Sequence, residues 1–272
     1  MPQLPENARL WLERAEIDYI GPFVKAWAAF NAWYRHASGS RRDSDGLRYV
    51  KNQVNPVRSR IKPLLRPRVL DQNGRLIVDA EDALQFKVLL RNLHAALDAY
   101  HLEVLRDDNV ERISFRTVCL SNGVNLPKRK PHRQHDYKVD KVSGLWICTV
   151  EHRTLATITA RIEQAGYSVD DLQSRQEFID LTFEQRSQFL SLYHECSPRP
   201  MTDLLAGTNT PIQAGDIAFH CTDEQLFTGL IEIIYGMRNA LLHGEIHPNE
   251  QAFRAYEHAY RIILQFLDCL RN

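Results

Sequence analysis

Residues 222–244 read TDEQLFTGLIEIIYGMRNALLHG and form the most informative stretch of the chain. Apolar side chains fill the middle of this stretch, which predicts a buried helix over about 222–242. The apolar positions are Leu226, Phe227, Leu230, Ile233, Ile234 and Met237. Gly244 follows directly, where glycine commonly ends a helix in the left-handed conformation. We therefore expect the polar residues before Gly244 to lie at a defined helix end.

Three polar residues gather at that end, with Arg238 and Asn239 adjacent and His243 just before the glycine. Five residues of helix rise about 7.5 Å, which a long arginine side chain can span. A guanidinium can brace phosphate oxygens, and an imidazole can exchange a proton with a ribose 2′-OH or a leaving 5′-oxygen. The group therefore suits RNA cleavage that needs no metal. The structural alternative is that His243 caps the last carbonyls while Arg238 forms an ion pair.

Most of the remaining chain is predicted to be helical. Aromatic residues spaced three and four apart predict a helix over about 22–37, and a similar leucine spacing predicts one over 79–105. Further helices are expected at about 151–165, at 183–195 and from Pro248 onward. The aromatic face of the first of these helices consists of Phe23, Trp27, Phe30, Trp33 and Tyr34. The final helix has an apolar seam that consists of Phe253, Tyr256, Tyr260, Ile263, Leu267 and Leu270.

Residues 111–150 depart from this helical pattern. Alternating apolar and polar residues, followed by a β-rich run at 145–150, predict two strands. The polar and basic residues 125–141 between them are expected to form a long mobile loop. The sequence thus predicts a mainly α protein with a single domain over 1–272, a basic segment at 41–70 and a small β-hairpin insertion at about 111–150.

The order Arg238, Asn239, three residues, His243 resembles the motif of the HEPN superfamily, in which an arginine and a following polar residue precede a histidine. The flanks are similar too, because an apolar helix precedes the motif and a final amphipathic helix begins with proline after it. The run WAAFNAWY at 27–34 resembles an early helix of many bacterial members. Residues 41–221 depart from the family pattern, so the resemblance covers about the last 50 residues and about 20 near the start.

The resemblance implies a HEPN-like helical bundle that forms a homodimer with a composite site at its interface. Typical members are metal-independent endoribonucleases of toxin, phage-defence or RNA-processing systems, and they leave a 2′,3′-cyclic phosphate. By position, Arg238 would stabilise the phosphate, His243 would be the acid or base, and Asn239 would orient the pair or the substrate. The implied partners are RNA, a second copy of the chain and an antitoxin or regulatory protein. The alternatives are a catalytically silent module that binds nucleic acid or nucleotide, and a regulatory partner subunit.

The net charge of zero conceals two oppositely charged halves. Residues 1–162 carry a net charge of +9 and residues 163–272 carry −9. A basic half is one indication of an anionic partner such as RNA. The candidate RNA-binding residues are Lys128, Arg129, Lys130, Arg133, Arg41 and Arg42. The alternative is that these cations are solvated, or that the two halves attract each other.

Other classes of function find little support in the sequence. The five cysteines are scattered without a Cys-x-x-Cys pair, which predicts reduced thiols and a cytoplasmic protein. Neither a metal site nor a cofactor is expected, because paired ligands and glycine-rich phosphate loops are absent from the sequence. No apolar run is long enough to cross a membrane. His94, in the motif-like run 91–94, is expected to be structural.

Overall fold

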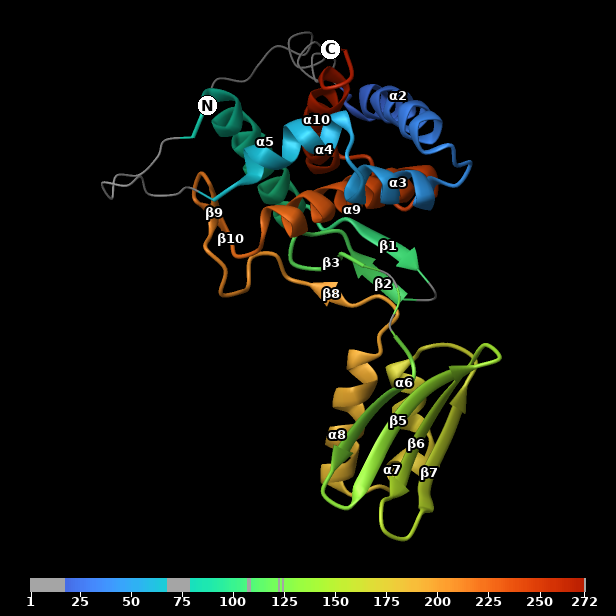
Figure 1. The fold of residues 1–272 in the computed structure, drawn as a ribbon. Coiled ribbons are helices and arrows are strands. Elements are labelled where there is room, and N and C mark those ends of the chain that lie inside the picture. The colour runs from blue at the N-terminus through green and yellow to red at the C-terminus, as the bar shows by residue number, and fades with distance from the viewer. Residues whose placement is uncertain (1–17, 68–78, 107–108, 122, 124, 272) are drawn as a thin grey trace, which may run out of the picture. The chain divides into compact units, whose positions relative to one another are not determined.

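In a computed structural model, the chain divides into two compact units (Figure 1). Unit 1 comprises residues 1–118 and 202–272, and unit 2 comprises residues 119–201. The structure describes residues 18–67, 79–106, 109–121, 123 and 125–271. The last three residues of the predicted basic segment, 68–70, lie outside the described residues.

Unit 1 combines a helical core with short β-hairpins. Its helices are α2 (Ile20–Ser38), α3 (Asp43–Asn52), α4 (Pro56–Ile61), the 3-10 helix η1 (Lys62–Leu65), α5 (Glu81–Ala99), α9 (Asp223–Leu242) and α10 (Glu250–Asp268). Its hairpins pair β1 (Glu103–Arg106) with β2 (Asn109–Arg112), and β9 (Ile212–Ala214) with β10 (Ile217–Phe219). Strands β3 (Val118–Cys119) and β8 (Met201–Thr202) pair with each other. Helix α10 packs against both α2 and α5, and α9 packs against α3 and η1.

The predicted helices of unit 1 are found, with two differences in detail. Helix α5 ends at Ala99 rather than near residue 105, because residues 103–106 pair with β2 instead. The fully buried face of α10 is Ala252, Ala255, Tyr256, Ala259, Ile262, Ile263 and Phe266. Small alanines on this face permit close approach to α2 and α5, so four residues of the predicted seam are only half-buried: Phe253, Tyr260, Leu267 and Leu270.

Unit 2 is a four-stranded antiparallel sheet with helices packed on it (Figure 1). Its strands are β4 (Lys128–His132), β5 (His135–Val142), β6 (Leu145–His152) and β7 (Thr157–Gln164), adjacent in that order. The helices that follow are α6 (Val169–Ser174), α7 (Gln176–Ile179) and α8 (Phe183–Glu195). Burial alternates along β5, β6 and β7, so one face of the sheet forms a core with the helices.

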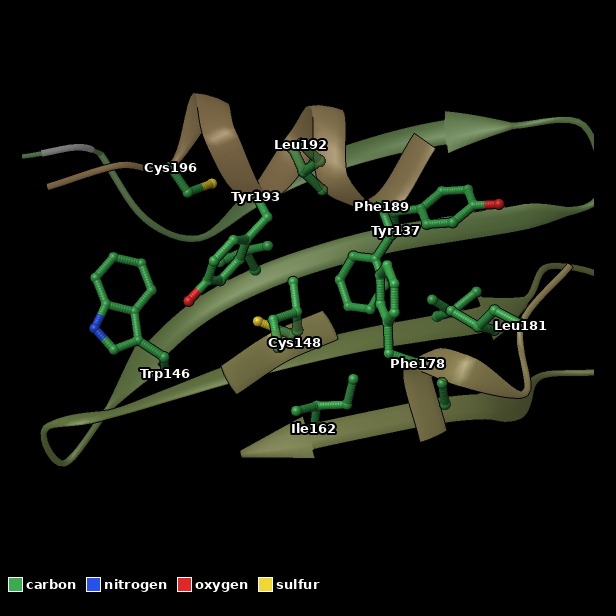
Figure 2. Close-up of a cluster of buried hydrophobic side chains, with 14 residues drawn as sticks. Tyr137, Trp146, Cys148, Ile162, Phe178, Leu181, Phe189, Leu192, Tyr193 and Cys196 are labelled. Atoms are coloured by element: carbon green, nitrogen blue, oxygen red, sulfur yellow. The ribbon is translucent and has the colours of Figure 1, made fainter. Parts of the chain in front are cut away.

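Figure 2 shows this core, in which aromatic rings from the sheet meet aromatic rings from α8. Tyr167 and Tyr193 stack with ring centroids 4.5 Å apart, and Trp146 lies edge-on to Tyr167. Burial raises the pKa of the Cys148 thiol to about 12 and that of Cys196 to about 11. The cluster is separate from the aromatic face of α2, which gives each unit its own apolar core.

The expectation of a mainly α bundle with a small β-hairpin insertion was wrong. The described residues contain four sheets, and one of them has four strands. Residues 128–141, expected in a mobile loop, instead form most of the β4–β5 hairpin, whose lysines reach α8. Residues 151–165, expected to be helical, instead contain the end of β6 and all of β7, where Ala160, Ile162 and Gln164 alternate inward with polar residues between them.

His94 lies in the core of unit 1, as its predicted structural role requires. Its side chain on α5 is 2% exposed and contacts the rings of Phe115 and Phe219. Burial lowers its pKa, opposed by the Asp98 carboxylate, while Arg116 and Arg112 lower it further and Asp203 raises it. His94 therefore favours the folded state when neutral.

We predict that unit 1 loses stability on acidification partly through His94. A histidine with a lowered pKa in the folded state contributes fully above its unfolded pKa of about 6.5, and the contribution is lost as the pH falls toward the folded pKa. Replacing His94 with Phe should reduce the stability difference between pH 7.5 and pH 5.5 in urea denaturation. His258, whose pKa is also lowered by burial, should maintain a residual pH dependence. An unchanged pH dependence in His94→Phe would contradict the assignment.

Candidate functional site at the end of helix α9

The C-terminus of α9 is held in a fixed geometry. Gly244 has φ of +72°, and its N–H donates to the Leu241 carbonyl at 3.2 Å. The next N–H, of Glu245, donates to the Ala240 carbonyl at 2.9 Å. These two bonds form a Schellman motif, which ends the helix at His243 as the glycine predicted. The backbone that carries His243 is therefore fixed.

Arg238 is bound by two side chains just before this end. One terminal nitrogen lies 3.5 Å from the Asp43 carboxylate of α3, and the other donates to the Asn239 side-chain oxygen at 2.9 Å. Its Nε is buried and has no hydrogen-bond partner among the described residues. The side chain is still 25% exposed. The guanidinium is thus oriented from two sides while part of it faces solvent.

Asp43 is itself fixed by α2. Asn31 donates its side-chain N–H to Asp43 at 2.9 Å and also to the Tyr34 hydroxyl. Burial raises the pKa of Tyr34, and the Asp43 carboxylate raises it further. Gly46 on α3 packs against the Tyr34 ring so closely that any side chain there would collide with it. A polar network therefore joins α2, α3 and α9, and it orders Arg238.

His243 is exposed and forms no hydrogen bond or ion pair through its side chain with any described residue. Only its backbone N–H is engaged, donating to the Asn239 carbonyl at 3.0 Å. No hydrogen bond or ion pair joins His243 to Arg238 among the described residues, because the guanidinium turns toward Asp43 and Asn239. The imidazole is thus accessible from solvent.

The structure places Arg41 and Arg42 directly before Asp43, at the start of α3. Both are exposed, and neither has an ion-pair partner among the described residues. The ion pair between Asp43 and Arg238 brings this segment beside the end of α9, although almost 200 residues separate them in the chain. Sequence reasoning proposed the two arginines but missed Asp43 and Asn31. Two features could have indicated them: the acidic residue at the start of α3, and an asparagine within an otherwise aromatic face.

The other predicted RNA-binding residues lie on β4 and in the turn after it, and most are engaged by α8. Lys128 donates to the Glu195 carbonyl at 3.0 Å, and Lys130 donates to Ser191 at 3.0 Å. Arg133 pairs with the Glu184 carboxylate. Arg129 is exposed and has no ion-pair partner among the described residues. Only one of these four cations is therefore fully available to an anionic partner.

Several ion pairs join the two oppositely charged halves of the chain. In unit 1, Lys62 pairs with Glu224 at 2.7 Å, and Arg58 and Lys51 pair with Glu224 and Glu232 of α9. Ion pairs also join Arg91 with Asp216, and Arg116 with Asp203. These pairs support the interpretation in which the two halves attract each other. The unpaired Arg41 and Arg42 are exceptions to it.

Searches of the structure and of known proteins add three findings. In the part of the chain that the structure describes, no group of three or more His, Cys, Asp or Glu side chains is arranged to hold a metal ion. No described helix combines the length and apolar character needed to cross a bilayer. A scan against models of protein families, a search of curated proteins and a search of solved structures each gave no significant match.

Because of these contacts, we expect Arg41 and Arg42 to contribute more to RNA binding than Lys128 and Lys130. For single-stranded RNA, each lost phosphate contact should reduce the slope of log affinity against log salt by about 0.7. Replacing Arg41 and Arg42 with Gln should therefore flatten the slope by about 1.4. The matched double variant Lys128→Gln/Lys130→Gln should change it by less than half as much, because those lysines are already engaged. Equal slopes for both variants would contradict the assignment.

Proposed function

We propose that the chain is a metal-independent endoribonuclease whose site lies at the C-terminal end of α9, acting in the cytoplasm as a toxin or phage-defence effector. The main support is the joint arrangement of an oriented Arg238 and an unengaged His243 at one rigid helix end. Arg41 and Arg42 add unpaired positive charge beside it. The five buried cysteines form no disulfide, which is consistent with a reducing compartment.

The proposed reaction is a transesterification within RNA. Neutral His243 accepts the proton of a ribose 2′-OH, and the 2′-oxygen forms a bond to the adjacent phosphorus. The bond from phosphorus to the 5′-oxygen breaks, and an imidazolium donates the proton that the leaving oxygen needs. Arg238 stabilises the charge that develops on the non-bridging oxygens. The products are a 2′,3′-cyclic phosphate and a 5′-hydroxyl end.

Two copies of the chain are proposed to share the scissile phosphate. One imidazole cannot be base and acid for the same phosphate at once, whereas two related by a two-fold axis can divide these roles. Leu242, next to His243, is 55% exposed and offers an apolar contact for such an interface. An antitoxin or other regulatory protein remains a further proposed partner.

A catalytically silent, nucleic-acid-binding module is the second candidate. The observation that favours it is the Asp43 carboxylate, which neutralises part of the charge of Arg238. The exposure of His243 and the partial exposure of Arg238 favour the enzyme, because a silent site has no need of an accessible imidazole. The two candidates differ in whether His243 is needed for RNA cleavage or only for binding.

We expect purified protein to cleave RNA in the presence of EDTA, and His243→Ala to reduce the rate at least 100-fold. General acid–base catalysis contributes about this much. His243 is exposed, so the variant should fold normally. His247→Ala is the matched control, because that side chain is also exposed and lies four residues away. Equal cleavage rates for His243→Ala and the wild type would defeat the catalytic proposal.

Mixed dimers test the shared site with the same variant. Heterodimers of wild type and His243→Ala should lose far more than half of the activity if both imidazoles serve one phosphate. Retention of half would indicate independent sites, and an active monomer in light scattering would also contradict the dimer.

We predict that Asp43 acts as a positioning residue for Arg238. Asp43→Asn should lower kcat about tenfold and leave KM nearly unchanged, since misplacing a group that stabilises the transition state affects the chemical step. The free energy of unfolding should change by less than about 1 kcal/mol, as expected for a pair near the surface. Asp45→Asn, which alters an Arg48 pair on the same helix, is the control. A similar fall in kcat for Asp45→Asn would contradict a specific role.

A further inference from the structure

Unit 2 contains a pocket that the candidate site does not use. It has a volume of about 480 Å³ and lies between the β4–β5 turn and the start of α8. The residues that line it are His132, Arg133, Gln134, His135, Tyr137, Thr182, Glu184 and Gln185. All of them belong to unit 2, so the pocket is complete within that unit.

One wall of the pocket carries the hydroxyl of a tyrosine whose ring is buried. Tyr137 is 1% exposed, and its ring belongs to the apolar core. Figure 2 shows its hydroxyl pointing away from the rest of that core. The hydroxyl has no hydrogen-bond partner among the described residues, and burial raises its pKa, as does Glu184. An O–H group in this position is available to a ligand in the pocket.

The histidines of the pocket are held by hydrogen bonds. The side-chain oxygen of Gln185 accepts from the Thr182 N–H at 2.9 Å, so its amide nitrogen faces His135 and donates to Nε2 at 3.1 Å. In the neutral ring the proton is then on Nδ1. His132 contacts Glu184 through Nε2 at 2.9 Å. His132 and His135 are paired directly across the turn, and the His135 ring lies edge-on to His152, with ring centroids 5.2 Å apart.

The remaining polar groups include both donors and an acceptor. Arg133 has φ of +52° and is 71% exposed, so most of its N–H groups are unused. Glu184 accepts from Arg133 and His132, which lower its pKa. The Glu184 carboxylate in the pocket lining opposes a simple anion such as phosphate. A planar ligand with hydrogen-bond donors and acceptors on one edge suits the pocket better.

An exposed aromatic residue lies next to two lining residues in the chain. Phe183 is 82% exposed and stands in the chain between Thr182 and Glu184, both of which line the pocket. Stacking on exposed aromatic side chains is a common way for proteins to bind unpaired bases. Arg129, exposed on β4, adds positive charge to the same hairpin.

We propose that this pocket receives one unpaired nucleobase of an RNA strand, which makes unit 2 a substrate-recognition module. The inference rests on the proposed function, because RNA is the substrate proposed there. The base stacks on Phe183 and the histidine rings, and its polar edge faces the Tyr137 hydroxyl, Arg133 and Glu184. The hydrogen-bond donors and acceptors on that edge determine which base the pocket prefers.

The test measures binding of nucleoside 5′-monophosphates to the full chain by calorimetry, with inorganic phosphate and ribose 5-phosphate as comparison ligands. Saturable binding of at least one nucleotide, with no comparable binding of the other two ligands, is expected. Phe183→Ala should weaken nucleotide binding about fivefold or more, and Tyr137→Phe, which removes only the hydroxyl, about fivefold. Ile158→Ala, an exposed apolar position on β7 outside the pocket, should leave binding unchanged.

Three outcomes would overturn the proposal. They are the absence of nucleotide binding, equal binding of inorganic phosphate, and equal losses in Phe183→Ala and Ile158→Ala. RNA cleavage in EDTA is measured on the same preparations. Nucleotide binding without cleavage would reject the proposed ribonuclease and retain the pocket. Cleavage without nucleotide binding would retain the proposed ribonuclease and reject the proposed role of the pocket.

Discussion

The burial of α9 constrains everything around it. Eleven of its twenty residues are buried, from Leu226 near its start to Ala240 in its last turn. Polar side chains on such a helix must find partners or lie where the helix reaches the surface. Glu224 and Glu232 meet cations of the basic segment, and Arg238 meets Asp43. The polar residues at the end of α9 are thus placed there because most of the preceding helix is buried.

The aromatic face of α2 supports the same arrangement from the other side. Phe23 lies edge-on to Tyr256 of α10, with ring centroids 5.0 Å apart, and the Tyr256 hydroxyl donates to the Met237 carbonyl at 2.8 Å. Trp27 stacks on Tyr235, one turn before Arg238. Apolar packing therefore fixes the α9 backbone, and the polar network from Asn31 fixes the guanidinium. Orientation of the site comes from two independent sets of contacts.

The sequence predicted α2, α8, α9 and the glycine end of α9 well, because helical spacing and capping residues are local signals. The Thr182 capping pattern, for example, is present with both of its hydrogen bonds. Unit 2 was less predictable, because its strands are stabilised by neighbouring strands and helices that a local sequence pattern does not identify. Lys128 and Lys130 were predicted as RNA-binding candidates in a mobile loop, but their partners on α8 lie more than sixty residues away. Asp43 was not predictable for the same reason, because it pairs with Arg238, which lies far away in the sequence.

The insertion of unit 2 into unit 1 has a consequence for the order of assembly. Unit 2 is continuous in the chain, whereas the apolar partner of α2 is α10, whose residues follow after an interval of more than two hundred positions. Chains emerge from the ribosome at about 5–20 residues per second, and domains tend to fold as they are completed. Unit 2 can therefore fold while α2 and α3 still await α9 and α10. A nascent chain has no assembled Arg238–Asp43 pair until translation has passed residue 238, so early folding and acquisition of the site are separated in time.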